Sequence, residues 1–365
     1  MTVDSDHGSE GSDDGGEKGS TEGVNRGSAD HDPEWPVRIP LSNEAFEGNN
    51  NAYLFAAGGE VGLVDTGVAT PDAREELRAR LADRGIGFAD VDAVALTHWH
   101  ADHAGLAGAI QAAGGATVHV HPADAPLVER DEEAWSGFRT ASVGRYEAWG
   151  MPPDRREELI AFLESTDDYD HAAPETTPVE DGDRLELGGT SLDVLHLPGH
   201  TAGLVGFALD APGGRDLLTG DALLPVYTPN VGGADLRVER PLATYLDTLD
   251  RIASGGYRRA LPGHRDPIAD PAARAREIAD HHADRARRVV DTLDRIGPAD
   301  AWTVSADLFG DLSGIHVLHG PGEAWAHLEH LERVGHVRRE GREYRLAGDP
   351  TDIPGDLLGR GTGDR

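Results

Sequence analysis

Four side chains able to bind a metal ion lie within six residues of one another, in residues 97–103. His98, His100, Asp102 and His103 supply three imidazoles and one carboxylate. The segment follows an apolar stretch typical of a buried strand and precedes a helix expected to begin near Ala104. Cations such as zinc accept imidazole nitrogen and carboxylate oxygen readily. The spacing therefore predicts a metal site on a strand-to-helix loop.

Three further segments place metal-binding side chains after short apolar stretches that favour strands. They contain His200, Asp221 and His264, each next to a glycine. Because strand ends can meet at one edge of a sheet, these residues can complete a site that residues 98–103 begin. An exposed loop that is merely rich in histidine is therefore disfavoured. The chain has no cysteine, so histidine and carboxylate side chains must hold any metal.

Taken together, these segments resemble the motifs of the metallo-β-lactamase superfamily. Residues 98–103 match its His-x-His-x-Asp-His motif, and Val64-Asp65-Thr66-Gly67 looks like its first motif. The later motifs match in the family's order, so the resemblance covers residues 35–284. It implies an α/β fold, a four-layer αββα sandwich with two divalent metal ions at one edge, expected to be zinc.

The resemblance also implies a ligand for each position around the two ions. His98, His100 and His200 would hold the first ion, Asp102, His103 and His264 the second, and Asp221 would bridge them. A water bound between two divalent ions ionises near neutral pH and needs no protein nucleophile beside it. We therefore expect a hydrolase of small esters, thioesters or lactones, with Asp102 and Asp221 taking part in catalysis.

The residue at the bridging position narrows the range of expected substrates. True β-lactamases of the family typically have cysteine or serine where this chain has Asp221. A carboxylate there is more typical of the glyoxalase II, lactonase and nuclease branches. Antibiotic hydrolysis is therefore disfavoured.

Several residues near these motifs allow two interpretations. Asp65 either orients a ligand or caps a turn. Tyr227 and Asn230 either line the substrate cleft or belong to a turn. The pair His281 and His282 is expected on a surface helix, outside the metal site.

The pattern between the motifs alternates strands and helices, as a layered α/β fold requires. Strands are expected at residues 61–65, 93–97, 117–120, 192–197, 204–209 and 216–218. Thr70 and Pro71 favour the start of a helix that Gly85 can close. Residues 127–180 interrupt the alternation with helical patterns, so a helical insertion is expected there.

The C-terminal residues 285–347 predict a winged helix: helices at 287–296, 303–309 and 323–334, then a hairpin at 336–346. Five arginines gather at its third helix and wing: Arg333, Arg338, Arg339, Arg342 and Arg345. The order of domains resembles a subgroup that includes mitochondrial endoribonucleases, so cleavage of single-stranded RNA is an alternative function. A module that only packs against the hydrolase is favoured, because residues 35–284 carry 20 Arg against 42 acidic residues and show no basic groove.

Two other classes of function remain weaker alternatives. A mononuclear iron dioxygenase of the persulfide type shares the first histidine motif, but the full set of seven ligands favours hydrolysis. A winged-helix regulator without enzymatic activity would not need those ligands.

The composition indicates the environment in which the chain works. Its 365 residues include 66 acidic residues against 33 Lys and Arg, a net charge of −33, and Lys18 is the one lysine. Such acid loading favours a halophilic, archaeal and cytoplasmic protein, because concentrated salt screens the repulsion. Residues 1–34 and 348–365 are expected to be flexible tails. No apolar run is long enough to span a membrane, and oligomeric state is not predicted.

Overall fold

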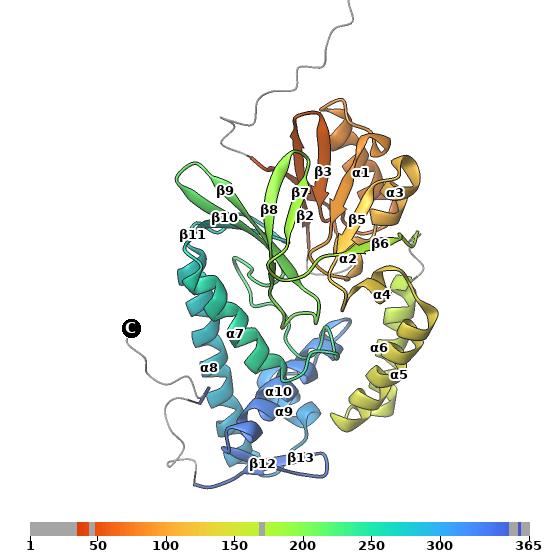
Figure 1. Cartoon of the computed structure of the whole chain (residues 1–365). Helices are drawn as coiled ribbons and strands as arrows, with labels where there is room; N and C mark the ends of the chain where they lie inside the picture. The colour runs from red at the N-terminus through yellow and green to blue at the C-terminus, as the bar shows by residue number, and fades with distance from the viewer. Residues whose placement is uncertain (1–34, 44–47, 168–171, 350–356, 359–365) are drawn as a thin grey trace, which may run out of the picture.

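Two β-sheets form the centre of the computed structural model, which describes residues 35–43, 48–167, 172–349 and 357–358 (Figure 1). The first sheet contains, in spatial order, β1 (Val37–Leu41), β2 (Asn50–Ala57), β3 (Glu60–Val64), β4 (Ala93–Ala95), β5 (Thr117–Val120) and β6 (Thr176–Pro178). The second contains β11 (Tyr257–Pro262), β10 (Gly214–Gly220), β9 (Val205–Ala211), β8 (Thr190–His196) and β7 (Arg184–Leu187). All six strands expected from the sequence are present, with ends shifted by at most two residues.

Ten α-helices and one 3₁₀-helix surround these sheets within the described part of the chain. They are α1 (Pro71–Ala82), η1 (Phe88–Asp90), α2 (Ala101–Ala104), α3 (Ala107–Gly114), α4 (Ala125–Val128), α5 (Glu132–Ala148), α6 (Pro153–Asp167), α7 (Pro241–Ser254), α8 (Pro271–Ile296), α9 (Ala301–Phe309) and α10 (His316–Arg333). Thr70 caps α1 as expected, with its hydroxyl accepting from the Ala73 amide at 3.2 Å.

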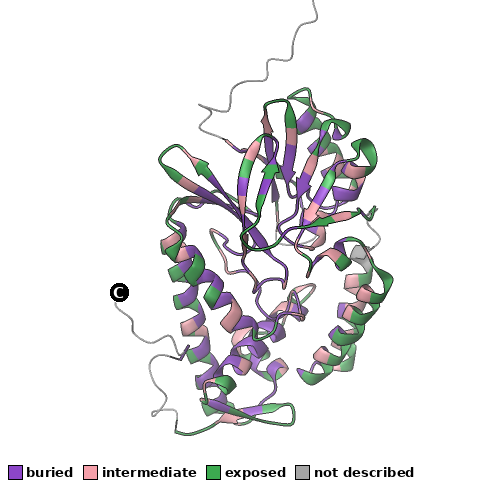
Figure 2. Cartoon of the chain, in the orientation of Figure 1, coloured by how far each residue is buried: buried purple, intermediate pink, exposed green. Residues whose placement is uncertain are grey.

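The elements stack in four layers, as the resemblance implies. Leu77 of α1 and Ile110 of α3 bury against the outer face of the first sheet. Between the sheets lies an apolar layer that includes Phe55 and Phe207. Leu246 of α7 belongs to the third core, which covers the outer face of the second sheet. Figure 2 shows buried residues in the strands of both sheets.

Strand direction brings the metal-binding segments together. Strands β3 and β4 run parallel in the first sheet, and β10 and β11 run parallel in the second. Their carboxyl ends lead into the segments that contain Asp65, His98, Asp221 and His264. The helix expected near Ala104 begins earlier, because α2 already starts at residue 101 inside the histidine motif.

The expected insertion at 127–180 is helical over α5 and α6, which lie side by side in Figure 1. Two details differ from the expectation. Its first helix, α4, begins before residue 127, and its last residues form β6, which pairs with β5 in the first sheet. Trp149 after α5 is buried in the same core as α10. The insertion therefore contacts both the first sheet, through β6, and the core around α10, through Trp149.

The C-terminal part shows three helices and a hairpin, β12 (Val337–Glu340) and β13 (Glu343–Leu346). The first helix is much longer than residues 287–296, because Asp270 caps it and Pro271 occupies its first turn. Consequently the expected boundary between residues 284 and 285 lies inside α8. The tails expected at 1–34 and 348–365 lie outside the described residues, apart from residues 348–349 and 357–358.

The expectation that His282 lies on a surface helix is wrong. His282 is completely buried where α8 packs against α10, while its neighbour His281 is exposed. The physical reason is the helical period: Ile278 and Ala286, four residues before and after His282, are buried on the same face. An imidazole thus occupies a core position of α8.

Candidate metal centre

His98, His100 and His200 form the first group of ligand atoms. Nδ1 of His100 lies 3.0 Å from Nε2 of His98 and 3.0 Å from Nε2 of His200. The first two histidines come from the loop after β4, and His200 comes from the loop between β8 and β9. The fold therefore brings together the three histidines that the resemblance places around one ion.

Asp102, His103 and His264 form the second group, and Asp221 lies between the groups. Nε2 of His264 is 3.5 Å from Oδ2 of Asp102, and Nε2 of His103 is 3.8 Å from the same oxygen. One oxygen of Asp221 is 3.6 Å from Nε2 of His103, and the other is 3.7 Å from Nε2 of His200. Asp221 thus faces ligands of both groups.

These seven residues fit divalent metal ions. Ligands that bind zinc tetrahedrally at about 2.0–2.1 Å lie about 3.3 Å from one another, close to the separations within the two groups. Oδ1 of Asp221 and Nε2 of His264 are buried without a hydrogen-bond partner. A buried polar atom without a partner costs about 1–3 kcal/mol, which a bound cation would remove.

The pKa values differ between the two groups. Burial and the neighbouring imidazoles lower the pKa of His98 and His100 well below the usual value, and burial lowers that of His200. In the second group burial also acts, but the charges of Asp221 and Asp102 outweigh it. They raise the pKa of His103 and bring that of His264 to about 9. At neutral pH these directions favour neutral imidazoles in the first group and protonated His103 and His264 in the second.

Asp65 orients a ligand, which is one of the two interpretations that the sequence allows; the other was a turn cap. Its Oδ2 accepts from Nδ1 of His103 at 2.8 Å and from the Thr97 hydroxyl at 2.8 Å, while Oδ1 accepts from the Thr97 amide. This contact leaves Nε2 of His103 as the atom that faces Asp102 and Asp221. Asp65 has a left-handed backbone conformation, with φ 57°, which aspartate tolerates better than most residues.

Residues that sequence reasoning did not single out support the second group. Nδ2 of Asn50 donates to Oδ2 of Asp102 at 3.0 Å, and Nδ2 of Asn43 donates to Oδ1 of Asn50 at 2.7 Å. Both asparagines are buried. No local motif marks them, because only the pairing of β1 and β2 brings them beside α2.

A buried ionic network supports the loop of the first group and was also not expected. Asp124 accepts from the Trp99 amide at 3.3 Å and from the Thr201 hydroxyl at 3.0 Å. Arg237 bridges Asp124 and Asp235 at 2.7 Å each. Burial raises the pKa of Asp124 to about 6 despite the charge of Arg237. The network ties both histidine-bearing loops to the segment after Asp221.

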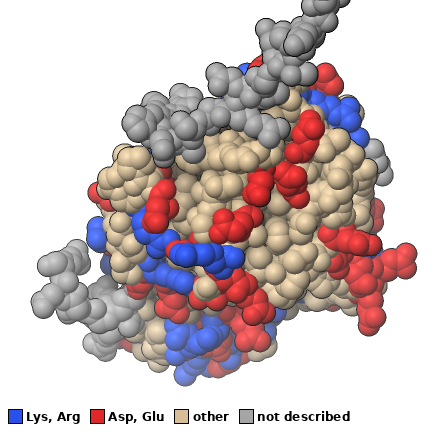
Figure 3. Space-filling model, turned by 45° about the horizontal axis from the view of Figure 1, so that its top comes forward, with Lys and Arg blue, Asp and Glu red and all other residues tan. Residues whose placement is uncertain are grey.

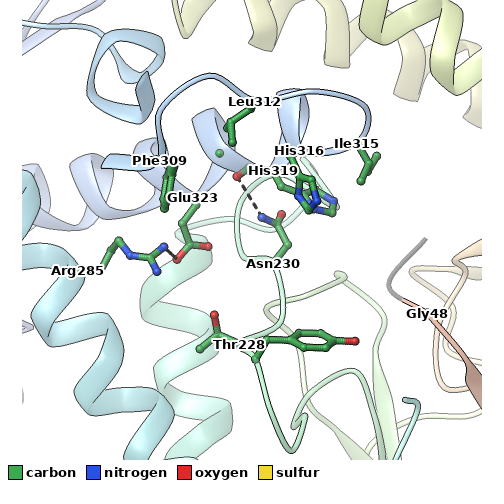
Figure 4. Close-up of a pocket in the computed structure, with 12 residues that line it drawn as sticks. Gly48, Thr228, Asn230, Arg285, Phe309, Leu312, Ile315, His316, His319 and Glu323 are labelled. Carbon is green, nitrogen blue, oxygen red and sulfur yellow. Dashed lines mark hydrogen bonds and ion pairs between the residues drawn. The ribbon is translucent and has the colours of Figure 1, made fainter. Parts of the chain in front are cut away.

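A pocket of about 550 Å³ adjoins the metal-binding cluster (Figure 4). Its lining residues are Gly48, Tyr227, Thr228, Asn230, Arg285, Phe309, Leu312, Ile315, His316, His319, Gly320 and Glu323. The carbonyl of Asn230 accepts from Nδ1 of His200 at 3.0 Å, and that of Gly48 lies 3.3 Å from Nδ1 of His264. Tyr227 and Asn230 therefore line a cavity beside the cluster. This agrees with the interpretation that they line a cleft and not with the alternative that they only form a turn.

Replacing Asp65 by asparagine should weaken metal binding without unfolding the chain. The amide cannot serve as a charged acceptor for the Nδ1 proton of His103, so we expect a loss of about 10–100-fold in metal affinity. The matched control is Asp92→Asn, because Asp92 also accepts a backbone N–H, that of Val61, but lies outside the cluster. Competition with a chromogenic chelator measures both. Equal metal affinity in the two variants would contradict the orienting role of Asp65.

The fold and the site together define a class of protein: an αββα sandwich with a histidine- and aspartate-rich cluster at the ends of its strands. The model of the metallo-beta-lactamase superfamily matches residues 45–264. The chain therefore belongs to the metallo-beta-lactamase superfamily. No helix in the described ranges is long and apolar enough to cross a membrane.

Three similar proteins illustrate the relationship. The crystal structure of a metallo-beta-lactamase family protein from Thermus thermophilus is 37% identical, with a TM-score of 0.74, and the match covers 85% of this chain and 97% of that one. The probable metallo-hydrolase YqjP of Bacillus subtilis is 26% identical over 304 residues, 81% of this chain and 91% of YqjP. An atrochrysone carboxyl ACP thioesterase of Emericella nidulans is 25% identical over 261 residues, 71% of this chain and 65% of the thioesterase.

Proposed function

We propose that this protein is a hydrolase of small esters, thioesters or lactones that depends on two divalent metal ions, preferably zinc. The observation that carries the proposal is the convergence of seven ligand residues, in two groups that share Asp221. An aspartate between two groups of ligands suits a pair of ions, whereas a mononuclear iron dioxygenase would need no second group.

Each residue of the cluster has a defined part in this proposal. His98, His100 and His200 would hold one ion, Asp102, His103 and His264 the other, and Asp221 both. When bound, the ions supply Lewis acidity and a hydroxide at neutral pH. Asp65 and the carbonyl of Asn230 hold the Nδ1 protons of His103 and His200, which leaves the Nε2 atom of each ring facing the cluster.

The adjoining pocket supports an ester-like substrate. Tyr227, Phe309, Leu312 and Ile315 give it apolar walls. Such a cavity can take the apolar part of an acyl group while the reacting carbonyl lies at the cluster. The similarity to a thioesterase points to the same substrate class.

A panel of substrates tests the proposal. We expect the protein to hydrolyse at least one of a thioester, a lactone and an aryl ester in molar KCl, with little or no cleavage of single-stranded RNA. The Asp221→Ala variant serves as the control for contaminating esterases. Cleavage of RNA alone would show that the nuclease alternative is correct.

We also propose that residues 285–347, a winged-helix-like module, pack against the hydrolase and do not grip RNA. Two arginines of the wing have acidic partners within the chain: Arg345 pairs with Glu340, and Arg342 lies 3.3 Å from Asp300. Figure 3 shows acidic groups scattered over the face in view, with basic groups among them. An acidic surface repels a polyanion.

The triple variant Arg338→Ala/Arg339→Ala/Arg342→Ala separates these two roles. We expect unchanged hydrolysis of small substrates, because each exposed ion pair is worth only about 0–1 kcal/mol of stability. RNA binding should be weak in both the wild-type protein and the triple variant when it is measured by filter binding across a salt series. A module that grips RNA would instead lose affinity and about one unit of salt slope for each phosphate contact removed.

Metal binding to the second group should tighten as the pH rises. His264 has a pKa of about 9 in the metal-free cluster, because the charges of Asp221 and Asp102 overcome the effect of burial. The ring is protonated below that pH and must release its proton to bind a metal, so affinity should increase up to about pH 9. The first group, with its lowered pKa values, should show little change between pH 6 and 9. Isothermal titration in buffers of different ionisation enthalpy measures the released protons, and a second ion whose affinity is independent of pH would contradict this assignment.

A further inference from the structure

A second set of metal-binding side chains lies outside the cluster described above, where α8 packs against α10. His282 on α8, and Glu323 and His327 on α10, are buried and offer ligand atoms that all lie within 4.8 Å of one another. Glu323 and His327 are four residues apart, which puts them on one face of α10. We propose that these three residues, the His282 cluster, bind one further divalent cation of the zinc type.

Two separations within the His282 cluster match those of metal ligands, and the third pair, Glu323 and His327, has ligand atoms within 4.8 Å of each other. Nδ1 of His282 lies 3.3 Å from Nε2 of His327 and 3.6 Å from Oε1 of Glu323. Ligands around tetrahedral zinc lie about 3.3 Å apart, given metal–ligand bonds of about 2.0–2.1 Å. Two imidazoles and one carboxylate also form a donor set found at zinc sites with an open fourth position.

One lone pair faces the position where the cation would lie. Nδ1 of His327 donates to the Glu323 carbonyl at 2.8 Å, so Nε2 of His327 carries a lone pair that faces His282. In the metal-free protein Nδ1 of His282 donates to this lone pair at 3.3 Å, and a cation bound there would move the His282 proton to Nε2, which is buried without a hydrogen-bond partner. Burial lowers the pKa of both rings, that of His327 to about 3, which keeps them in the neutral form that binds metals.

The site also has an entry path and an opposing charge. Glu323 lines the pocket beside the metal-binding cluster, and Figure 4 shows its carboxylate next to the guanidinium of Arg285. Nη1 of Arg285 lies 3.1 Å from Oε1 of Glu323. In the metal-free protein the arginine compensates the negative charge of the buried carboxylate. In the metal-bound protein the positive charge of the arginine would repel the cation. Removing Arg285 should therefore tighten metal binding, whereas it would only destabilise a network of hydrogen bonds without a metal.

The test uses the full-length chain with the first cluster disabled. The double variant His98→Ala/Asp221→Ala, depleted with a chelator and dialysed against zinc, should retain one tightly bound equivalent by elemental analysis. Adding His327→Gln, or Glu323→Gln if the first variant is unfolded by circular dichroism, should remove that equivalent. Zinc should raise the melting temperature of the double variant and leave that of the triple variant unchanged.

Two further measurements locate the ion and test the charge argument. Anomalous diffraction at the zinc edge should show a peak between His282, Glu323 and His327. Arg285→Met in the double-variant background should raise zinc affinity about tenfold or more, because a like charge close to the ion is lost. The same zinc content in the double and triple variants, or no anomalous peak at the three residues, would overturn the proposal.

Discussion

Asp221→Ala should lose at least one bound metal ion relative to the wild-type chain and should lose hydrolytic activity by more than a hundredfold. The carboxylate lies within 3.4–3.7 Å of His264, His103 and His200, so it contacts ligands of both groups. Replacing a residue that only supports a ligand typically costs about 10–100-fold, and a bridging ligand should cost more. Elemental analysis and turnover of a small thioester measure the two effects.

A matched control for this variant is Asp216→Ala. Asp216 is also a buried aspartate and lies in β10 itself, but its partners are Arg258 and Arg259, at 2.7 Å each. Its loss should lower stability and leave the number of bound ions unchanged. An Asp221→Ala protein with wild-type metal content would contradict the bridging role.

The melting temperature should rise by about 10 °C or more between dilute buffer and molar KCl. At an unfolding entropy of about 2.1 cal/mol/K per residue, a change of that size corresponds to about 7 kcal/mol for a chain of this length. The net charge of −33 drives it, and runs such as Asp131, Glu132 and Glu133 are consecutive and exposed. At molar ionic strength the Debye length falls to about 3 Å, so their mutual repulsion is screened. This behaviour would suit a protein that works in concentrated salt.

Two controls separate screening from a general effect of solutes. Sucrose at equal osmolality should raise the melting temperature much less than KCl does, because it screens no charge. The variant Glu132→Gln/Glu133→Gln should need less salt to reach the same stability. A chain equally stable in dilute buffer would contradict the halophilic interpretation.

The metal-binding residues could be predicted from the sequence because they are concentrated where strands end. Residues 97–103 hold four of the seven ligands, and the others follow short apolar stretches. The supporting residues Asn43 and Asn50 could not be predicted from the sequence, because they reach Asp102 only through the pairing of β1 with β2. Contacts between distant segments leave no periodic signal in the chain.

The C-terminal helices show where local signals misled. Asp270 and Pro271 mark the start of α8. This signal is present in the sequence, but the prediction of a shorter helix at 287–296 did not use it. For α10 the difficulty is the reverse, since Gly320, Pro321 and Gly322 favour a break. The helix continues because tertiary packing needs small residues there: a Cβ at Gly322 would lie 2.3 Å from the Cα of Gly233.

Turnover of a small thioester or lactone during zinc titration of the chelator-treated chain in molar KCl tests the central claim most directly. The proposal predicts no activity without metal, and activity that returns as the two groups around Asp221 fill. The His327→Gln background keeps the His282 cluster from contributing to the count. Full activity in the chelated protein, or activity restored by one iron ion and not by zinc, would contradict a two-metal hydrolase.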